Sequence, residues 1–435
     1  MPPQKILIIG TGIAGPVLAT FLFLSPLPAS SLPHITLLER SSSPRPHGQN
    51  IDIRGTGMTI IRKLGLEGTI RASTTGEEGV QFVNEQNRIL AQFEADKTGK
   101  VQTGTSDVEI LRGKLAEILL ARCMEVSQRV MREGGKGVEC IFGDVVEELE
   151  QDGDGVKVKF RESGEERRFD LVVGADGLQS RTRRMVFGQE GESTRLHRLG
   201  AYGGFFSMPR GETDGIWRRW FITHGRKGVM VRPHTEKDKA TVFMMALTLK
   251  DGRFEEVAVK GNKGAKEQKE LLEEYFRGAG WECDRIIKEM NASDDFYYDM
   301  IAQVKMDSWS KGRVVLLGDA GYCGSPLSGM GTTLGLNGAY NLAGALLQHP
   351  DDYTAAFAQY EERMRPLVDR AQKLAPGMPW LIHPETTWGI FILRSVVAAM
   401  YWSNIQKLVA SFAGPPANAV PVGDYGFKEL PESRL

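Results

Sequence analysis

The chain has 435 residues, 41% of them hydrophobic and 25% charged, which excludes disordered, collagen-like and small disulfide-stapled proteins. Its 54 basic and 55 acidic residues give a formal net charge of −1, which argues against nucleic acid as a partner. The length favours two interleaved domains. Glycine is unusually frequent, with 50 residues, roughly one in nine against an average of about 7%, so many backbone positions are expected to need positive φ or close approach to another group.

The first predicted strand, residues 5–9, runs into a glycine-rich loop that opens a helical pattern over residues 16–24, and a second strand follows at 34–38. This order is typical of a dinucleotide site, where glycines allow a tight turn and approach to a pyrophosphate, and an acid accepts ribose hydroxyls. The glycines and proline inside the segment argue against a signal peptide. The candidate residues are Gly10, Gly12, Ile13, Ala14 and Gly15 in the loop, and Glu39 and Arg40 at the end of the second strand.

Two further candidates come next along the chain. A helical pattern over residues 108–122 has Arg112 near its start, and this side chain either reaches a ligand or forms a surface ion pair. An apolar strand at 169–173 breaks into a turn of glycine and aspartate that contains Asp176. Because α/β sheets place ligands beyond the carboxyl ends of their strands, Asp176 is expected near a ligand.

The middle of the chain, about residues 199–249, alternates polar and apolar residues and is rich in aromatics, which predicts an inserted antiparallel sheet. Strand alternation places Arg219 on the same face as Trp217 and Phe221. A cation among aromatic rings could orient a carbonyl or phenolate of a substrate. Since arginine is mostly exposed in proteins, a plain solvent-side role for Arg219 stays open beside this one.

The α/β pattern returns with a strand at 313–317, a long glycine-rich loop and a helix from about residue 332 to 347. The unpaired N–H groups at the start of this helix would stabilise an anion or an electron-rich ring edge in the loop. A carboxylate at the strand end can accept two hydroxyl hydrogens, whereas it would be costly if left unpaired in a closed site. The candidate residues are Gly318, Asp319, Pro326, Gly329, Gly331 and Thr332.

The cysteines and the C-terminal region carry weaker signals. The four cysteines are far apart and form no C-x-x-C pair, which argues against a metal site or a disulfide framework and favours a reducing, cytoplasmic compartment. The apolar segment 388–412 is interrupted by Arg394 and by polar residues, so a packed amphipathic helix is favoured over a membrane span. Peripheral membrane contact by this helix is the less favoured alternative.

Three of these motifs, in this order, resemble the FAD-dependent aromatic hydroxylase family of flavoprotein monooxygenases, especially its fungal and tetracycline-modifying members. They are the N-terminal fingerprint, the stretch from Gly174 to Arg183, and the loop that begins Gly318-Asp319 and ends Pro-x-x-Gly-x-Gly. The resemblance implies that Gly10, Gly12 and Gly15 hold the FAD pyrophosphate, Glu39 the adenosine ribose, Arg112 and Asp319 the ribityl and pyrophosphate region, and Gly329 to Thr332 the pyrimidine edge of the flavin, with Asp176 ordering the pyrophosphate region.

Two departures from the family pattern are expected to lie near the flavin and on the following helix. Gly321-Tyr322 stands where many members have Ala-His, and Asn341 stands where aspartate is frequent. They weaken any transfer of a substrate from the family to this chain.

The resemblance also implies the architecture. The fold class is α/β, with a Rossmann-like FAD-binding domain of glutathione-reductase type formed by residues 1–75, 105–185 and 300–365. A mostly antiparallel β-sheet domain for the substrate would comprise residues 76–104 and 186–299. A C-terminal helical segment, 366–435, would brace both domains.

The implied activity is that of an FAD-dependent monooxygenase. It would use NAD(P)H and O2, through a flavin C4a-hydroperoxide, to hydroxylate or epoxidise a bulky aromatic, polyketide or alkaloid-like molecule in secondary metabolism or xenobiotic modification. Because the sequence has no second fingerprint, NAD(P)H is expected to be a transient hydride donor. We also expect a monomer and no metal site. The alternatives are a flavin-binding regulatory protein without turnover, and a reductase or halogenase on the same fold, although the G-W-x-W-x-I-P motif of halogenases is absent from the sequence.

Overall fold

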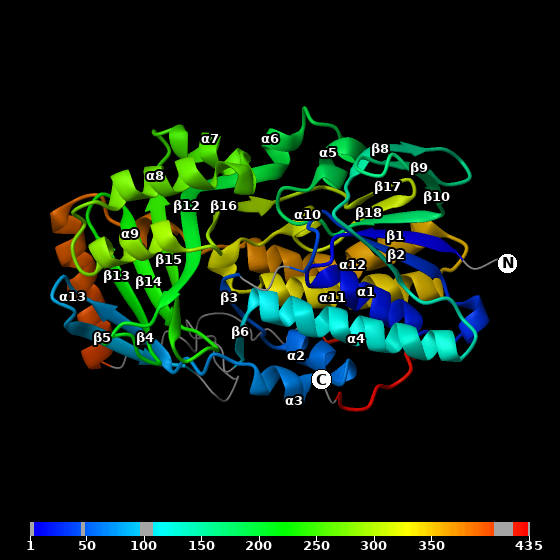
Figure 1. Ribbon diagram of the computed structural model, residues 1–435, viewed down its shortest axis with the longest axis horizontal. Helices are drawn as coiled ribbons and strands as arrows, with labels where there is room; N and C mark the ends of the chain where they lie inside the picture. The colour runs from blue at the N-terminus through cyan, green and yellow to red at the C-terminus, as the bar shows by residue number, and fades with distance from the viewer. Residues whose placement is uncertain (1–3, 45–47, 96–107, 404–420, 434–435) are drawn as a thin grey trace.

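The computed structural model describes residues 4–44, 48–95, 108–403 and 421–433. Figure 1 shows two halves side by side, a parallel sheet with its helices on the right and a second sheet with its own helices on the left. The mixed α/β fold class expected from the sequence is confirmed.

A six-stranded sheet forms the centre of the right half. Its order is β17 (Ser310–Lys311), β18 (Val314–Leu316), β11 (Leu171–Gly174), β1 (Lys5–Ile9), β2 (His34–Glu39) and β7 (Glu139–Phe142), all parallel except β17. Ile8 of β1 pairs with Leu37 on one side and Val173 on the other. Buried parallel strands are apolar on both faces, which is why β1 is continuously apolar rather than alternating.

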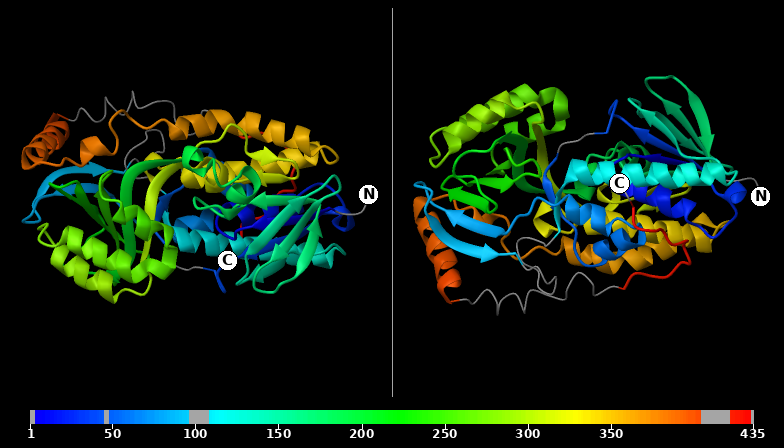
Figure 2. Two further views of the ribbon diagram at one scale, coloured as in Figure 1. Left: turned by 90° about the horizontal axis from the view of Figure 1, so that it is seen from above. Right: turned by 60° about the horizontal axis from the view of Figure 1, so that its bottom comes forward.

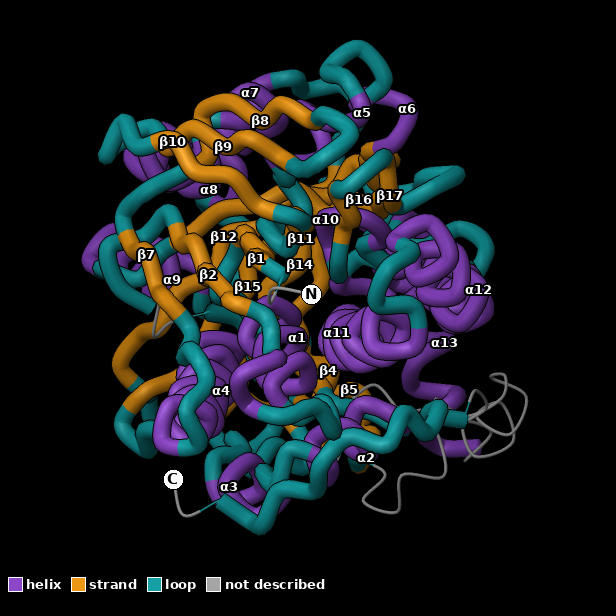
Figure 3. Tube along the Cα trace, turned by 90° about the vertical axis from the view of Figure 1, so that its right-hand side faces the viewer, coloured by secondary structure: helices purple, strands orange, loops and turns teal. Residues whose placement is uncertain are grey.

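Each face of this sheet is covered by a different layer (Figure 3). Ile6 and Ile8 pack towards the helices α1 (Ala14–Phe23), α4 (Arg112–Arg132) and α11 (Gly331–Gln348), with α12 (Tyr353–Gln372) beside α11. Leu7 and Ile9 pack on the other side against β8 (Val146–Gln151), β9 (Val156–Phe160) and β10 (Glu166–Phe169), a small antiparallel sheet. Burial on both faces fixes the carboxyl ends of the parallel strands, from which the site loops leave.

The left half is built on a seven-stranded sheet. Its order is β16 (Tyr297–Val304), β12 (Leu196–Pro209), β15 (Lys239–Leu247), β14 (Lys227–Pro233), β13 (Arg218–Thr223), β4 (Gly79–Val83) and β5 (Ile89–Glu94). All neighbours are antiparallel except β13 and β4. The helices α7 (Arg253–Val259), α8 (Ala265–Phe276) and α9 (Cys283–Ala292) cover one face, as Figures 1 and 2 show.

Short elements connect the halves or line their junction. The helices are α2 (Thr56–Lys63), α3 (Glu67–Ala72), α5 (Arg181–Phe187), α6 (Glu192–Arg195) and α10 (Asp319–Tyr322), and β3 (Asn50–Asp52) pairs antiparallel with β6 (Glu109–Leu111). The described residues also form 3₁₀ turns at Ala29–Ser31, Gly261–Gly264, Pro326–Ser328 and Trp380–Ile382.

After α12 the chain crosses to the left half and later returns. Helix α13 (Thr387–Ser403) lies beside β5 (Figure 2). Its Arg394 forms an ion pair with Glu85, which lies in the turn between β4 and β5. Residues 421–433 lie against the helices of the right half: the N–H of Lys428 donates to the carbonyl of Leu24 at 2.8 Å, and that of Ser433 to the carbonyl of Gly65 at 2.7 Å.

The outer side of α13 is apolar and exposed. Trp388 at its start is 69% exposed and Trp402 near its end is 81% exposed, with Phe391, Ile392 and Val396 between them. Across the residues that the structure describes, no helix combines the length and apolar character needed to cross a bilayer.

Candidate active site

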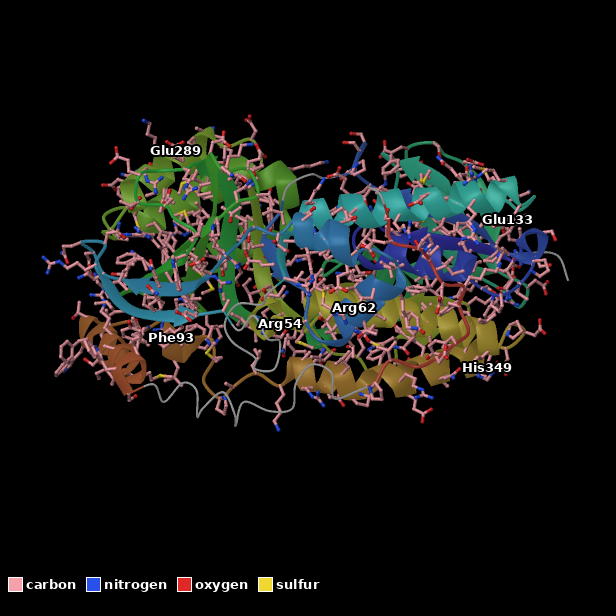
Figure 4. The ribbon with its side chains drawn as sticks, turned by 90° about the horizontal axis from the view of Figure 1, so that it is seen from below. Arg54, Arg62, Phe93, Glu133, Glu289 and His349 are labelled. Atoms are coloured by element: carbon pink, nitrogen blue, oxygen red, sulfur yellow. The ribbon has the colours of Figure 1, made fainter. Side chains whose placement is uncertain are left out.

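A cavity of about 670 Å³ lies where the two halves meet. Its right-hand wall is formed by glycine-rich loops at the carboxyl ends of β1 and β18, and its left-hand wall by the seven-stranded sheet. Figure 4, drawn from below, shows Arg54 near the middle of the molecule and Phe93 on the side of β5; both line the cavity. The loop residues that line it include Gly12, Ile13, Ala14, Gly318, Asp319, Pro326, Gly329, Gly331 and Thr332.

The three fingerprint glycines have different surroundings. A Cβ on Gly10, whose φ is +116°, would lie 2.4 Å from the carbonyl oxygen of Ala175, and a Cβ on Gly15 would lie 2.1 Å from that of Gly10. These two glycines are therefore required by backbone packing. A Cβ on Gly12 would meet only Nη2 of Arg112, at 3.8 Å, because Gly12 faces the cavity.

Glu39 holds the fingerprint loop in place. One carboxylate oxygen accepts from the N–H and the hydroxyl of Thr11, at 3.1 and 3.0 Å, and the other from the N–H of Ser41 at 3.1 Å. Arg40 is exposed. Neither side chain lines the cavity.

Arg112 and Asp319 line the cavity, and the carboxylate of Asp299 lies close enough to both to be affected by their charges. Arg112 begins α4 and Asp319 begins α10. Burial raises the pKa of Asp299 on β16 to about 6, the charge of Asp319 adds to this shift, and Arg112 and Arg40 oppose it. Asp299 was missed in the sequence because it lies in a strand without any motif, and only the pairing of β16 with β12 brings it here.

Asp176 orders the turn after β11 without lining the cavity. Its carboxylate accepts from the hydroxyl of Ser180 at 2.6 Å and from the N–H of Thr182 at 3.0 Å, while Ser180 caps α5. Arg183 on the same helix is fully buried, forms an ion pair with Glu192, and donates to the carbonyl of Ala320 at 2.7 Å. This contact ties the Asp176 turn to the segment that carries Asp319.

The loop between β18 and α11 presents backbone donors to the cavity. Gly329 has a φ of +60°, and Met330 at the start of α11 provides no side-chain cap. A Cβ on Gly331 would have nothing within 4 Å. The Ser325 hydroxyl is buried and has no hydrogen-bond partner within the described residues, although Ser325 lines the cavity. These are features of a wall built to receive a polar ligand.

The prediction that Arg219 orients a substrate is wrong, because its side chain does not line the cavity. The Nη1 atom of Arg219 donates to Oδ1 of Asn87 at 2.8 Å, and the side chains of β13 that line the cavity are those of Arg218 and Trp220. Alternation along a strand determines which residues share a face but not which face a ligand meets. The face of Arg219 packs instead against Asn87 and Trp281, whose ring lies 5.5 Å from that of Phe221.

On the neighbouring strands β12 and β15, too, residues that line the cavity lie beside residues that face the core. Tyr202, Phe206 and Met244 are buried in the core and do not line the cavity. The aromatic and sulfur-containing wall consists of Phe82, Phe93, Phe205, Trp220, Met230, Phe243 and Met245.

The two departures from the family pattern also lie away from the cavity. Tyr322 is fully buried and turns towards α12, where its hydroxyl lies 2.7 Å from that of Tyr360. Asn341 donates to the carbonyl of Asn337 at 2.8 Å and accepts from the hydroxyl of Tyr425 at 2.8 Å. Tyr322 was expected near the cofactor and is instead a core residue.

Comparison with known proteins agrees with this geometry. The family model described as an FAD binding domain matches residues 4–375. The chain is 37% identical to the FAD-dependent monooxygenase asL6 of Sarocladium schorii over 93% of this chain and 94% of the relative. It is 34% identical to the monooxygenase CTB7 of Cercospora beticola, again over 93% and 94%. The crystal structure of tetracycline destructase Tet(55) superposes with a TM-score of 0.75 at 31% identity, covering 97% and 99%.

The fold and the site thus define a flavin-dependent oxygenase. The chain belongs to the FAD-binding-domain family and is an FAD-dependent monooxygenase. The residues present fit this cofactor: Gly12 leaves room for a ligand, α11 begins at the cavity with Gly331 and Thr332 and has no side-chain cap, and Ser325 offers a buried hydroxyl without a partner among the described residues.

Proposed function

We propose that this enzyme uses NAD(P)H and O2 to insert one oxygen atom into a bulky aromatic, polyketide or alkaloid-like molecule, in secondary metabolism or in modification of a xenobiotic. The observation that carries the proposal is the cavity itself, in which glycine loops face an aromatic wall across about 670 Å³. A volume of this order suits a ligand of drug-like size beside a flavin ring.

The proposal assigns the cofactor to residues of the right-hand wall. Gly12 and the first turn of α1 would hold the pyrophosphate, Arg112 and Asp319 the ribityl and pyrophosphate region, and the Gly329–Thr332 segment the pyrimidine edge of the flavin. When bound, FAD supplies the oxidising chemistry, after reduction by NAD(P)H and reaction with O2. The N-terminal dipole of α11 favours negative charge on the ring edge that it meets.

The aromatic wall has two tasks in this proposal. Phe205 and Phe243 stack with ring centroids 4.2 Å apart, and Phe82 and Trp220 at 5.2 Å, which gives flat, rigid surfaces on which an aromatic substrate can stack. The same side chains exclude water from the reacting face. Exclusion of water protects a reactive oxygen donor from hydrolysis before transfer.

Turnover with a substrate panel tests the proposal. The purified yellow holoprotein is mixed with NADPH or NADH in air, with and without members of a panel of polycyclic phenols and polyketides. We expect at least one compound to accelerate oxidation of the nucleotide and to gain one oxygen atom by mass spectrometry, derived from isotopically labelled O2. A slow rate that no compound changes, with no oxygenated product, would contradict turnover and favour the regulatory alternative.

A further inference from the structure

Four charged side chains form a cluster at the cavity wall. Arg218 Nη2 lies 2.7 Å from Glu77 Oε1 and 3.4 Å from Glu109 Oε2, and Arg232 Nε lies 2.9 Å from Glu77 Oε2. Arg232 is also paired with Glu109. Both glutamates are buried, whereas both arginines line the cavity. The cations therefore form the surface that a ligand meets, and the carboxylates lie behind them.

The strands place the two arginines next to each other. The antiparallel register of β13 and β14 pairs Arg219 with Val231 and Trp220 with Met230, so Arg218 and Arg232 are opposite at the next position. Within the described residues, the hydrogen bonds of Arg232 use Nε and Nη2, and none uses Nη1. Arg232 thus keeps a donor for a ligand in the cavity that it lines.

Polar and charged groups surround the carboxylate of Glu109. Its Oε1 accepts from the amide of Asn50 at 2.7 Å and from the hydroxyl of Thr75 at 2.9 Å. Burial raises the pKa of Glu109 to about 7; Glu77 and Asp52 add to the shift, and Arg232 and Arg218 oppose it. Asp52 is itself paired with Arg54 at 2.9 Å.

The charges constrain what the group can accept. With two arginines and two ionised glutamates the group is neutral, and a third anion would leave an excess negative charge in a buried place, which is unfavourable. Protonation of one glutamate removes that excess. The arginines then offer charge-assisted hydrogen bonds to the new anion.

We propose that Arg218 and Arg232 form a subsite for an ionised oxygen of the substrate, a carboxylate, phenolate or enolate on an aromatic ring, and that Glu109 takes up one proton when this anion binds. This inference deepens the proposed function and rests on it for the claim that the ligand is a substrate. Glu77 and Glu109 act through the arginines and are positioning residues. The proton comes from solvent for a carboxylate, and from the ligand itself for a phenol that binds as phenolate.

Ligand binding to the oxidised holoenzyme, without NAD(P)H, tests the subsite separately from turnover. The probes are 2-naphthoate and its neutral counterpart 2-naphthamide, and the readout is the flavin absorbance change. We expect the Kd of naphthoate to rise about tenfold from about pH 6 to about pH 8, since binding is linked to one proton with a pKa near 7, and the Kd of naphthamide to stay constant. Equal pH dependence for the two probes would overturn the proposal without need of any variant.

Three variants locate the effect. Arg232→Met should weaken naphthoate binding at least about tenfold and leave naphthamide unchanged. Glu109→Gln should remove the pH dependence and bind naphthoate at about pH 8 as tightly as the unmodified enzyme does at about pH 6. Arg219→Met is the matched control, because this neighbouring arginine bonds Asn87 outside the cavity. An equal loss of naphthoate affinity in Arg219→Met, or an unchanged pH profile in Glu109→Gln, would refute the assignment.

The two proposals can fail independently. If naphthoate shows the expected pH profile but no compound in the panel is oxygenated, the subsite stands and the proposed function falls. If compounds are oxygenated and their anionic and neutral forms bind alike, the function stands and the subsite falls.

Discussion

The hydroxyls of Tyr322 and Tyr360 lie 2.7 Å apart in the fully buried space between α10 and α12. Tyr360 also lies 3.2 Å from the carbonyl oxygen of Leu316, at the end of β18. Tyr322 can occupy this place because α11 has a glycine beside it: a Cβ on Gly338 would lie 2.0 Å from the Tyr322 hydroxyl. The strand end that leads to Asp319 is therefore held by a tyrosine pair and a glycine.

The close approach of Gly338 and Tyr322 predicts that Tyr322→Phe reduces the destabilisation caused by Gly338→Ala. Gly338→Ala should lower the free energy of unfolding by about 2 kcal/mol, because the added methyl overpacks a full core. In a Tyr322→Phe background the same change should cost clearly less, since the nearest atom is gone, although Leu317 Cδ1 at 3.0 Å and Cζ of residue 322 at 3.2 Å stay close to the added methyl. Chemical denaturation of the four proteins of this double-mutant cycle measures the coupling. Equal effects of Gly338→Ala in both backgrounds would show that the hydroxyl is not the obstacle.

The fingerprint glycines predict two opposite phenotypes. Gly15→Ala should prevent accumulation of folded protein, because its methyl group would meet a backbone carbonyl at 2.1 Å. Gly12→Ala should fold, because the nearest atom to its Cβ is 3.8 Å away, and should bind FAD at least about tenfold more weakly. Circular dichroism and flavin titration separate the two effects. A folded Gly12→Ala protein with unchanged FAD affinity would contradict the assignment of Gly12 to the cofactor.

Arg112 and Asp319 predict the loss of the yellow colour. Purified Arg112→Ala and Asp319→Ala should retain less FAD per chain than the unmodified protein, since each removes a polar group from the cavity wall. Lys114→Ala is the control, because this exposed lysine on the same helix pairs only with Glu117 at 3.2 Å within the described residues. The measurement is the ratio of flavin to protein absorbance. Full retention of FAD in both test variants would exclude them from the cofactor site.

His383 predicts sensitivity to acid. Burial lowers the pKa of His383 from its ordinary 6.5 to about 4, and Arg226 adds to the shift, whereas the Pro379 carbonyl opposes it. The folded protein keeps this histidine neutral while the unfolded chain takes up a proton. Stability from this group is therefore present above the unfolded pKa and is lost as the pH falls towards 4, by on the order of 3 kcal/mol.

The fall of Tm between about pH 6.5 and about pH 4 should be smaller in His383→Phe than in the unmodified protein. His224→Gln, which changes an exposed histidine, should leave that fall unchanged. Thermal unfolding followed at several pH values gives the comparison. An acid-induced fall in Tm that is the same in His383→Phe as in the unmodified protein would show that another group is responsible.

The part of the site that was predicted from sequence is the part encoded locally. The glycines at 10, 12 and 15 lie within one turn between a strand and a helix, so their spacing alone carries the geometry. Arg112 and Asp319 begin helices directly after strands, and a strand end in an α/β fold already indicates its position relative to ligands.

The rest depends on contacts between distant residues. Arg219 bonds Asn87, 132 positions earlier in the sequence. This partner cannot be recognised before the fold is known, so the sequence does not show which face of β13 meets the cavity. Glu109 bonds Arg232 123 positions later, and nothing in its local sequence marks it as part of a site. Tyr322 was placed near the cofactor by its neighbours in sequence, but the space opposite Gly338 determined its direction.

The contacts of residues 421–433 have a consequence for the order of events during synthesis. Helix α1 is among the first segments to leave the ribosome, yet the carbonyl that ends it, at Leu24, is bonded by Lys428. The central sheet likewise needs β18, which begins at Val314, 140 residues after its partner strand β11 ends at Gly174. The cofactor-binding half therefore gains its last backbone contacts only after residue 433 has emerged from the ribosome.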